Sequence, residues 1–94
     1  RKALSDFWQK AGRHDSEQPL RAWLYEVKAA KWKNSAEIKV KYRTASIINN
    51  KRIVFNICGN KYRLIAAINY QIGIVFIRFI GTHIEYDKVN PEEV

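Results

Sequence analysis

Four segments rich in Ile, Val, Phe and Tyr follow one another in the second half of the chain, and they constrain its fold more than any other feature. They cover residues 45–48, 52–58, 62–69 and 74–80, and their composition is typical of β-strands. The intervening residues, Asn49-Asn50, Gly59-Asn60 and 70–73, favour tight turns. Because such short turns join antiparallel neighbours, the sequence predicts an antiparallel meander.

The first half of the chain shows helical spacing of apolar residues instead. An amphipathic helix is predicted over residues 2–11, with Gly12 as its stop. Asp15, Ser16 and Pro19 are typical of a helix start, so a second helix should run from there to about residue 31, with Asp15 or Ser16 as its cap. Ser35 is expected to cap a short third helix, and residues 82–89 to form a last one. The predicted fold class is α+β, a two-layer sandwich of helices packed on an antiparallel sheet.

Length and composition exclude several classes of protein. The 94 residues suit a single domain, residues 1–94. No apolar run approaches the roughly 18 residues that cross a bilayer, and the polar, basic N-terminus is unlike a secretory signal, so no membrane association is expected. Cys58 is the one cysteine and cannot form an internal disulfide, which indicates a reducing, cytoplasmic compartment. Two histidines and one cysteine do not suffice for zinc, so no metal site is predicted.

The predicted Gly59-Asn60 hairpin also indicates which side chains share a face of the sheet. A two-residue loop pairs Asn56 with Arg63 and Val54 with Ile65. Side chains alternate along a strand, so one face should meet the helices and the other should be open. The open face is predicted to carry the basic and amide side chains of Arg52, Asn56, Lys61 and Arg63.

An arginine in an apolar strand is the next candidate for function. If the turn over residues 70–73 holds four residues, Arg78 lies opposite Ile65 and joins the open face. Arginine is costly there unless it reaches water or an anion. Two interpretations stay open, an ion pair with Glu85 or Asp87 and a contact with a phosphate group. Together with the open-face residues, Arg78 would complete a phosphate cradle.

Positive charge is concentrated in the middle third of the chain. The net charge is +8, and the stretch 28–63 contains ten Lys or Arg residues and a single acid, Glu37. This stretch is either an ordinary solvated surface or a surface that faces nucleic acid or the ribosome. Such a block repels itself unless an anion binds it, which favours the second interpretation. The residues predicted to bind RNA are Lys31, Lys33, Lys39, Lys41, Arg43, Lys51, Arg52, Asn56 and Asn60.

His83 lies directly after the last predicted strand, in a run that also holds Tyr86 and two carboxylates. An imidazole titrates near neutral pH and can transfer protons, although a single histidine is more often structural. Cys58 has no histidine near it in the sequence, so an idle thiol is expected. Trp32 lies between two lysines and either stacks on a base or covers the edge of the core. Trp8 and Trp23 belong to helical stripes and are predicted in the core.

Two blocks of the sequence carry a family resemblance. They are VFN-x-x-GN-x-YRL over residues 54–64 and R-x-x-GTH-x-EYD over residues 78–87. These blocks resemble the HigB-type toxins of bacterial type II toxin–antitoxin systems, within the RelE-like superfamily, and the segments 2–7 and 17–23 fit as well. Such toxins usually begin with a short β-strand before the first helix, and that strand is expected to be absent here, because Arg1 already falls in the first turn of the predicted helix.

The resemblance implies a RelE-like sandwich and a ribosome-dependent mRNA endonuclease, an mRNA interferase. Toxins of this kind cut mRNA in the A site of the 30S subunit by attack of the ribose 2′-OH, without metal or organic cofactor, and a HigA-type helix-turn-helix antitoxin neutralises them. The superfamily also includes non-catalytic toxins that inhibit DNA gyrase, which is the alternative hypothesis.

Catalytic roles are implied by the same resemblance. Arg63 and Arg78 would hold the phosphate, and His83 would act as the acid or base. Tyr86 would orient the nucleotide or share proton transfer, and Lys61 would add charge.

Overall fold

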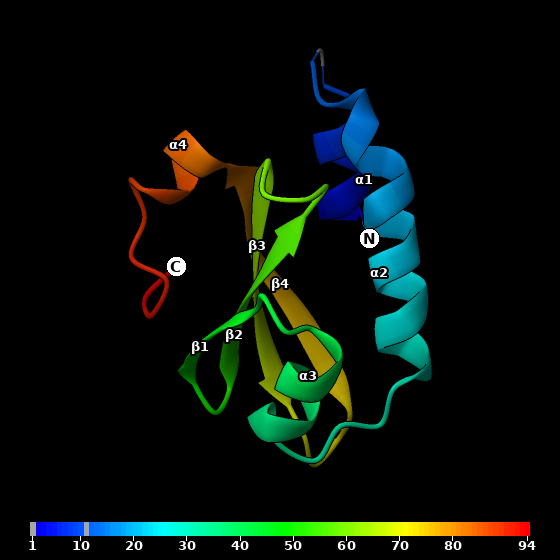
Figure 1. Ribbon diagram of the computed structural model, residues 1–94, viewed down its shortest axis with the longest axis vertical. Coiled ribbons are helices and arrows are strands. Elements are labelled where there is room, and N and C mark those ends of the chain that lie inside the picture. The colour runs from blue at the N-terminus through cyan, green and yellow to red at the C-terminus, as the bar shows by residue number, and fades with distance from the viewer. Residues whose placement is uncertain (1, 11) are drawn as a thin grey trace.

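A computed structural model describes residues 2–10 and 12–94 and confirms the α+β sandwich (Figure 1). The strands form one antiparallel sheet in the order β1-β2-β3-β4. The helices α1 and α2 lie along one side of the sheet, while α4 and the C-terminal segment lie on the other (Figure 1). In chain order the elements are α1 (Lys2–Trp8), the 3-10 helix η1 (His14–Ser16), α2 (Glu17–Ala29), α3 (Ser35–Lys41), β1 (Ser46–Asn49), β2 (Arg52–Ile57), β3 (Tyr62–Asn69), β4 (Ile74–Thr82) and α4 (His83–Tyr86).

Two of the predicted helix caps are wrong. A 3-10 turn precedes α2 and leaves Ser16 in a helical backbone conformation, whereas a capping residue normally has an extended one. The Ser16 hydroxyl donates instead to the Arg13 carbonyl at 2.6 Å, and Asp15 accepts from Tyr62 at 2.6 Å. The helix α3 is capped by Asn34 rather than Ser35, since the Asn34 side chain accepts from the Glu37 amide. The first helix ends at Trp8, and the predicted last residue, Ala11, lies outside the described residues.

The core lies between the helices and the sheet. The ring of Phe7 meets that of Tyr62 edge-on, with centroids 5.2 Å apart, and Trp23 meets Phe55 at 5.3 Å in the same manner. Trp8 and Trp23 are both buried, which confirms their predicted place. The other residues of this buried cluster are Leu4, Leu20, Val27, Ile38, Ala45, Ile53, Ile57, Leu64, Ala66 and Ile68.

The predicted register between β2 and β3 is confirmed. The predicted register between β3 and β4 is wrong from the middle of the two strands onward. Asn56 lies opposite Arg63 and Val54 opposite Ile65. The loop itself is longer than predicted, because residues 58–61 all belong to the turn. In the next pair Ile65 faces Phe79 rather than Arg78, because a bulge shifts the register there. A bulge adds one unpaired residue to a strand and lets two successive side chains leave the alternation.

The second face of the sheet is not fully open. The C-terminal segment returns across it (Figure 1), and the Arg52 guanidinium donates to the carbonyls of Pro91, at 3.2 Å, and Val94. Val54 and Ile65 point to this face and are buried, although they lie outside the cluster beneath the helices. The predicted open face is therefore corrected. Arg52 holds the returning chain, and the accessible part of the face lies toward Arg63.

Candidate active site

Three side chains of the predicted site meet where β4 leaves the sheet. In the register of β3 and β4, Gly81 lies opposite Arg63 and Thr82 lies opposite Tyr62. The chain turns into α4 directly after Thr82, so His83 and Tyr86, the first and last residues of that helix, lie beside Arg63. The site is thus formed by neighbouring strands and the helix that follows them.

Arg63 is the centre of this group. Its Nη2 atom lies 2.8 Å from His83 Nε2 and 3.3 Å from Asn60 Oδ1, and its guanidinium stands 5.2 Å from the centre of the Tyr86 ring. Both N–H groups of Nη2 are therefore in use. Within residues 2–10 and 12–94, Nη1 has no hydrogen-bond partner, and neither has the buried Nε. The arginine is held by its neighbours and keeps donors for an anion.

The contact with Arg63 determines the tautomer of His83. A guanidinium only donates hydrogen bonds, so Nε2 must be the acceptor and the ring proton must be on Nδ1. Nδ1 faces the Asp87 carboxylate, whose Oδ2 atom is 3.6 Å away. The imidazole is half-exposed, so a substrate can reach it. His83 is arranged as a proton acceptor at Nε2, with a carboxylate behind it.

A glycine makes room for this group. A Cβ atom at Gly81 would lie 2.6 Å from Phe79 Cζ and 2.8 Å from Glu85 Oε1, which is closer than non-bonded atoms approach. Gly81 is buried and directly opposite Arg63. The missing side chain lets the Phe79 ring and the Glu85 carboxylate pack over the strand beside the arginine.

The position of α4 is secured by Glu85. Thr82 accepts from the Glu85 amide at 3.2 Å, and the Glu85 carboxylate accepts from the Thr82 amide at 2.9 Å, which is a complete capping box. The second carboxylate oxygen lies 2.8 Å from Arg13 Nη2. The Thr82 hydrogen bond and the Arg13 charge hold the pKa of Glu85 below its usual value. The T-x-x-E spacing of these two residues is a sequence signal for such a cap, although no cap was predicted at this position.

Lys61 does not share the face of Arg63, and its predicted placement is wrong. It belongs to the turn, where strand alternation does not apply, and its Nζ atom bonds to the Asp15 carboxylate and stands 5.4 Å from the Tyr62 ring centre. This hydrogen bond, followed by that from Tyr62, lowers the pKa of Asp15, and the same carboxylate raises the pKa of Lys61. Lys61 fastens the turn to the loop before α2.

Arg78 lies in the bulge and is exposed, with its guanidinium 5.8 Å from the Phe76 ring centre. The hypothesis of an ion pair with Glu85 or Asp87 is wrong, because Glu85 pairs with Arg13 and Asp87 faces His83. No contact in the described part of the chain joins Arg78 to the group around Arg63.

The residues predicted to bind RNA fall into two groups. Several are engaged within the protein: Lys39 donates to the Arg43 and Ala45 carbonyls, Lys41 lies 3.9 Å from Glu26, and Asn56 donates to the Thr44 carbonyl. Arg52 and Asn60 are engaged as described above. In the other group the charged ends have no ion-pair partner among the described residues, and its members are Lys31, Lys33, Arg43 and Lys51.

Neither a membrane span nor a metal cluster occurs in residues 2–10 and 12–94. No helix among the residues that the structure describes has the length and apolar character to cross a membrane. In the same residues, no three His, Cys, Asp or Glu side chains gather in a way that could hold a metal ion.

The comparison with protein families shows to which family the chain belongs. The family model for HigB toxins, the RelE-like toxic component of a toxin–antitoxin system, matches residues 16–89. The chain therefore belongs to the HigB toxin family and is the toxin of a toxin–antitoxin system, which implies a cognate antitoxin. No curated protein sequence matches it.

Proposed function

We propose that this toxin is a metal-independent endoribonuclease that cuts mRNA in the A site of the 30S ribosomal subunit and so stops translation. The observation that carries the proposal is the contact of Arg63 with His83 and Tyr86, which combines a fixed cation, an imidazole and a phenol at a half-exposed position. We further propose that the antitoxin that neutralises it is of the HigA helix-turn-helix type.

The reaction needs three groups. A base removes the proton of the ribose 2′-OH, and the 2′-oxygen attacks the adjacent phosphorus. A cation stabilises the additional negative charge on the phosphoryl oxygens. An acid protonates the 5′-oxygen as its bond to phosphorus breaks, which leaves a 2′,3′-cyclic phosphate and a 5′-hydroxyl end.

His83 is the proposed base. Its Nε2 atom already accepts a hydrogen bond, from Arg63, and the 2′-OH would take the place of that donor. The Asp87 carboxylate beside Nδ1 would stabilise the imidazolium that forms. This arrangement follows the common pattern of a base oriented by a second group.

Arg63 is the proposed phosphate ligand, because its two Nη1 N–H groups are available to donate to the phosphoryl oxygens of a bound RNA. Tyr86 is the proposed donor of the proton to the leaving oxygen, with its ring held against Arg63. Arg78 is proposed to contact the RNA backbone beside this group. Lys61 is bound to Asp15. We therefore propose that Lys61 only stabilises the turn that carries Asn60, which accepts from Arg63.

The ribosome is proposed to supply the alignment that the toxin lacks. The three groups lie at one edge of the sheet, and two of the nearby amides are occupied, Asn56 by the Thr44 carbonyl and Asn60 by Arg63. Free RNA would therefore bind in many poses, and few of them would place a 2′-OH in line with the scissile bond.

Single-turnover cleavage on programmed ribosomes tests the proposal. His83→Gln should slow cleavage roughly 10²–10⁴-fold, and Arg63→Ala about 10²–10³-fold, while both variants still bind ribosomes. Cys58→Ser is the matched control and should cut at the wild-type rate, since the half-buried thiol lies in the turn outside the group. Wild-type rates in both the His83 and Arg63 variants would exclude the proposed mechanism at these two residues. Absence of cleavage by the wild-type protein on programmed ribosomes would exclude the nuclease and favour a binding toxin. Equal cutting of free and translated mRNA would exclude the dependence on ribosomes.

A further inference from the structure

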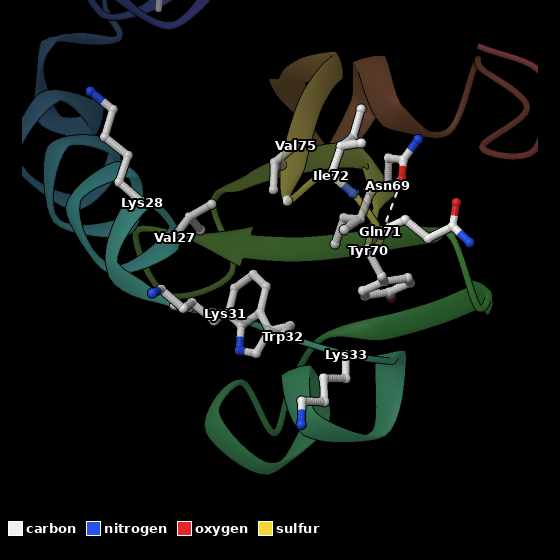
Figure 2. A pocket seen from close by; sticks show the side chains of 13 residues that line it. Val27, Lys28, Lys31, Trp32, Lys33, Asn69, Tyr70, Gln71, Ile72 and Val75 are labelled. Atoms are coloured by element: carbon white, nitrogen blue, oxygen red, sulfur yellow. Dashed lines mark hydrogen bonds between the residues drawn. The ribbon is translucent and has the colours of Figure 1, made fainter.

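A pocket of about 470 Å³ lies far from the candidate active site, between the end of α2 and the turn that joins β3 to β4. Figure 2 shows the Trp32 indole between Val27 on one side and Tyr70 on the other, with Ile72 and Val75 above it. Arg63 is at the other end of β3, and its side chain points to the other face of the sheet. The pocket is thus a separate feature of the molecule.

Lysines surround this pocket. Lys28, Lys31 and Lys33 all line it, and no Asp or Glu is among the described residues that do so. None of the three ammonium groups has an ion-pair partner in residues 2–10 and 12–94, unlike Lys41 and Lys61 elsewhere in the basic stretch. The three lysine side chains are exposed and extend outward from the pocket in different directions (Figure 2). Unpaired ammonium groups placed in this way would meet an anion, such as a phosphate group, at the rim of the pocket.

The aromatic wall of the pocket is firmly held. Trp32 packs against the edge of the core and meets the Tyr42 ring at 6.1 Å with an angle of 80°. The Tyr42 hydroxyl in turn bonds to Glu26, and its ring packs on Phe55. Trp32 remains only partly buried, whereas the other two tryptophans of the chain are buried. A supported and accessible indole can stack on a base without a large loss of side-chain freedom.

A second cavity beside the pocket is also lined by aromatic, basic and amide side chains. Tyr70 is shared with a neighbouring cavity of about 370 Å³, which Asn50 and Lys51 help to line. Asn69 and Gln71 line both cavities. The Asn69 oxygen accepts from the backbone amides of Gln71 and Ile72, which leaves its NH2 group and the Gln71 side-chain amide to pair with base edges. Lysines around an aromatic platform are the combination of side chains that binds single-stranded nucleic acid.

We propose that this pocket binds an unpaired nucleotide of ribosomal RNA, with its base on Trp32 and its flanking phosphates on Lys28, Lys31 and Lys33. The choice of ribosomal RNA rests on the proposed function, whereas the preference for a single-stranded nucleotide rests on the pocket alone. Bound in this way, the RNA would anchor one end of the toxin while the opposite end carries the group around Arg63.

Intrinsic tryptophan fluorescence during titration with a single-stranded RNA hexamer tests the proposal. Base stacking on Trp32 should quench the emission of the wild-type protein, and Trp32→Phe should abolish the quenching. Trp32→Leu should weaken binding roughly 5- to 150-fold, the effect of losing one base–aromatic stack. Changing Lys28, Lys31 and Lys33 to Gln should each lower the slope of log affinity against log salt by about 0.7.

Lys10→Gln is the charge-matched control, because Lys10 is exposed but lines none of these cavities. It should leave both the quenching and the hexamer affinity near their wild-type values. Hexamer binding that is unchanged in both Trp32→Leu and the triple lysine variant would overturn the proposal, whether or not those variants lose affinity for the antitoxin. The lysine variant alters only exposed side chains, so it keeps the test valid if Trp32→Leu fails to fold.

The two assays test the proposed nuclease mechanism and the proposed nucleotide pocket independently. His83→Gln should cut poorly and yet quench as the wild-type protein does. Absence of quenching beside a cleavage defect in His83→Gln would reject the pocket and leave the nuclease intact. Quenching that depends on Trp32 beside normal cleavage by the His83 variant would reject the nuclease mechanism alone.

Discussion

Glu85 offers the sharpest test of how the fold holds the candidate site. Its carboxylate accepts from the Thr82 amide and also pairs with Arg13, so it joins α4, which carries His83 and Tyr86, to the loop before α2. Glu85→Gln keeps an oxygen that can accept from Thr82 but removes the charge. Glu85→Ala removes both interactions. The two variants therefore separate the cap from the ion pair.

The magnitudes follow from the exposure of each contact. The Arg13 pair is partly exposed, with side chains 22% and 43% accessible, so Glu85→Gln should lower the free energy of unfolding by about 0.2–1 kcal/mol. Glu85→Ala also loses a hydrogen bond, so its total loss should be about 1–2.5 kcal/mol. Single-turnover cleavage should fall further in Glu85→Ala than in Glu85→Gln, because only the alanine variant frees the start of α4.

The pH dependence gives a second readout of the Glu85 charge. The folded protein lowers the pKa of Glu85 below its ordinary value of 4.5. A lowered pKa means that the stabilisation is fully present above the unfolded value and is lost as the pH falls through the folded one. The difference in stability between wild type and Glu85→Gln should therefore be constant near neutral pH and shrink below about pH 4.5.

Urea unfolding between pH 3 and pH 7 measures these differences. Glu17→Gln is the matched control, since Glu17 forms an exposed pair with Arg21 on α2, away from α4. It should cost about 0.3–0.5 kcal/mol and leave cleavage unchanged. The reasoning fails if Glu85→Ala is no less stable than Glu85→Gln, or if the stability difference at pH 7 persists undiminished at pH 3.

Three further substitutions test other contacts of the fold. Gly81→Ala should lower the stability to urea by about 1–3 kcal/mol, because its Cβ would overlap Phe79, and an unchanged midpoint would contradict that packing. Asp15→Asn should be less stable than wild type at neutral pH, and this difference in stability should shrink as the pH falls through the lowered pKa of Asp15. A difference in stability that does not depend on pH would show that the charge of Asp15 beside Lys61 is not its cause. Arg52→Met should release the C-terminal segment and speed amide hydrogen exchange in β2, whereas protection equal to wild type would show that the guanidinium does not hold the segment.

Local patterns in the amino-acid sequence determine much of this protein by themselves. The alternation of apolar residues and the turn residues at 59–60 are sufficient to predict β2 and β3 and to pair Asn56 with Arg63. This is possible because one face of each strand must be buried, and a slip of one residue would reverse both faces. The motif around His83 is also local, and it carries the family resemblance that the comparison confirms.

Contacts between distant residues are decided by the tertiary structure alone. The sequence predicts Asp15 or Ser16 as a helix cap, but the fold places Asp15 beside Lys61, forty-six positions away in the chain. Local patterns do not reveal the bulge that displaces Arg78, because a strand with one extra residue keeps the same apolar composition.

The same limit applies to the accessible surfaces. The sequence indicates a basic stretch, but only packing determines which lysines are paired within the protein and which surround the Trp32 pocket. The open face is likewise reduced by the C-terminal segment, whose backbone carbonyls accept from Arg52. Backbone carbonyls have no signature in the sequence, so where a returning chain docks depends on the shape of the folded sheet.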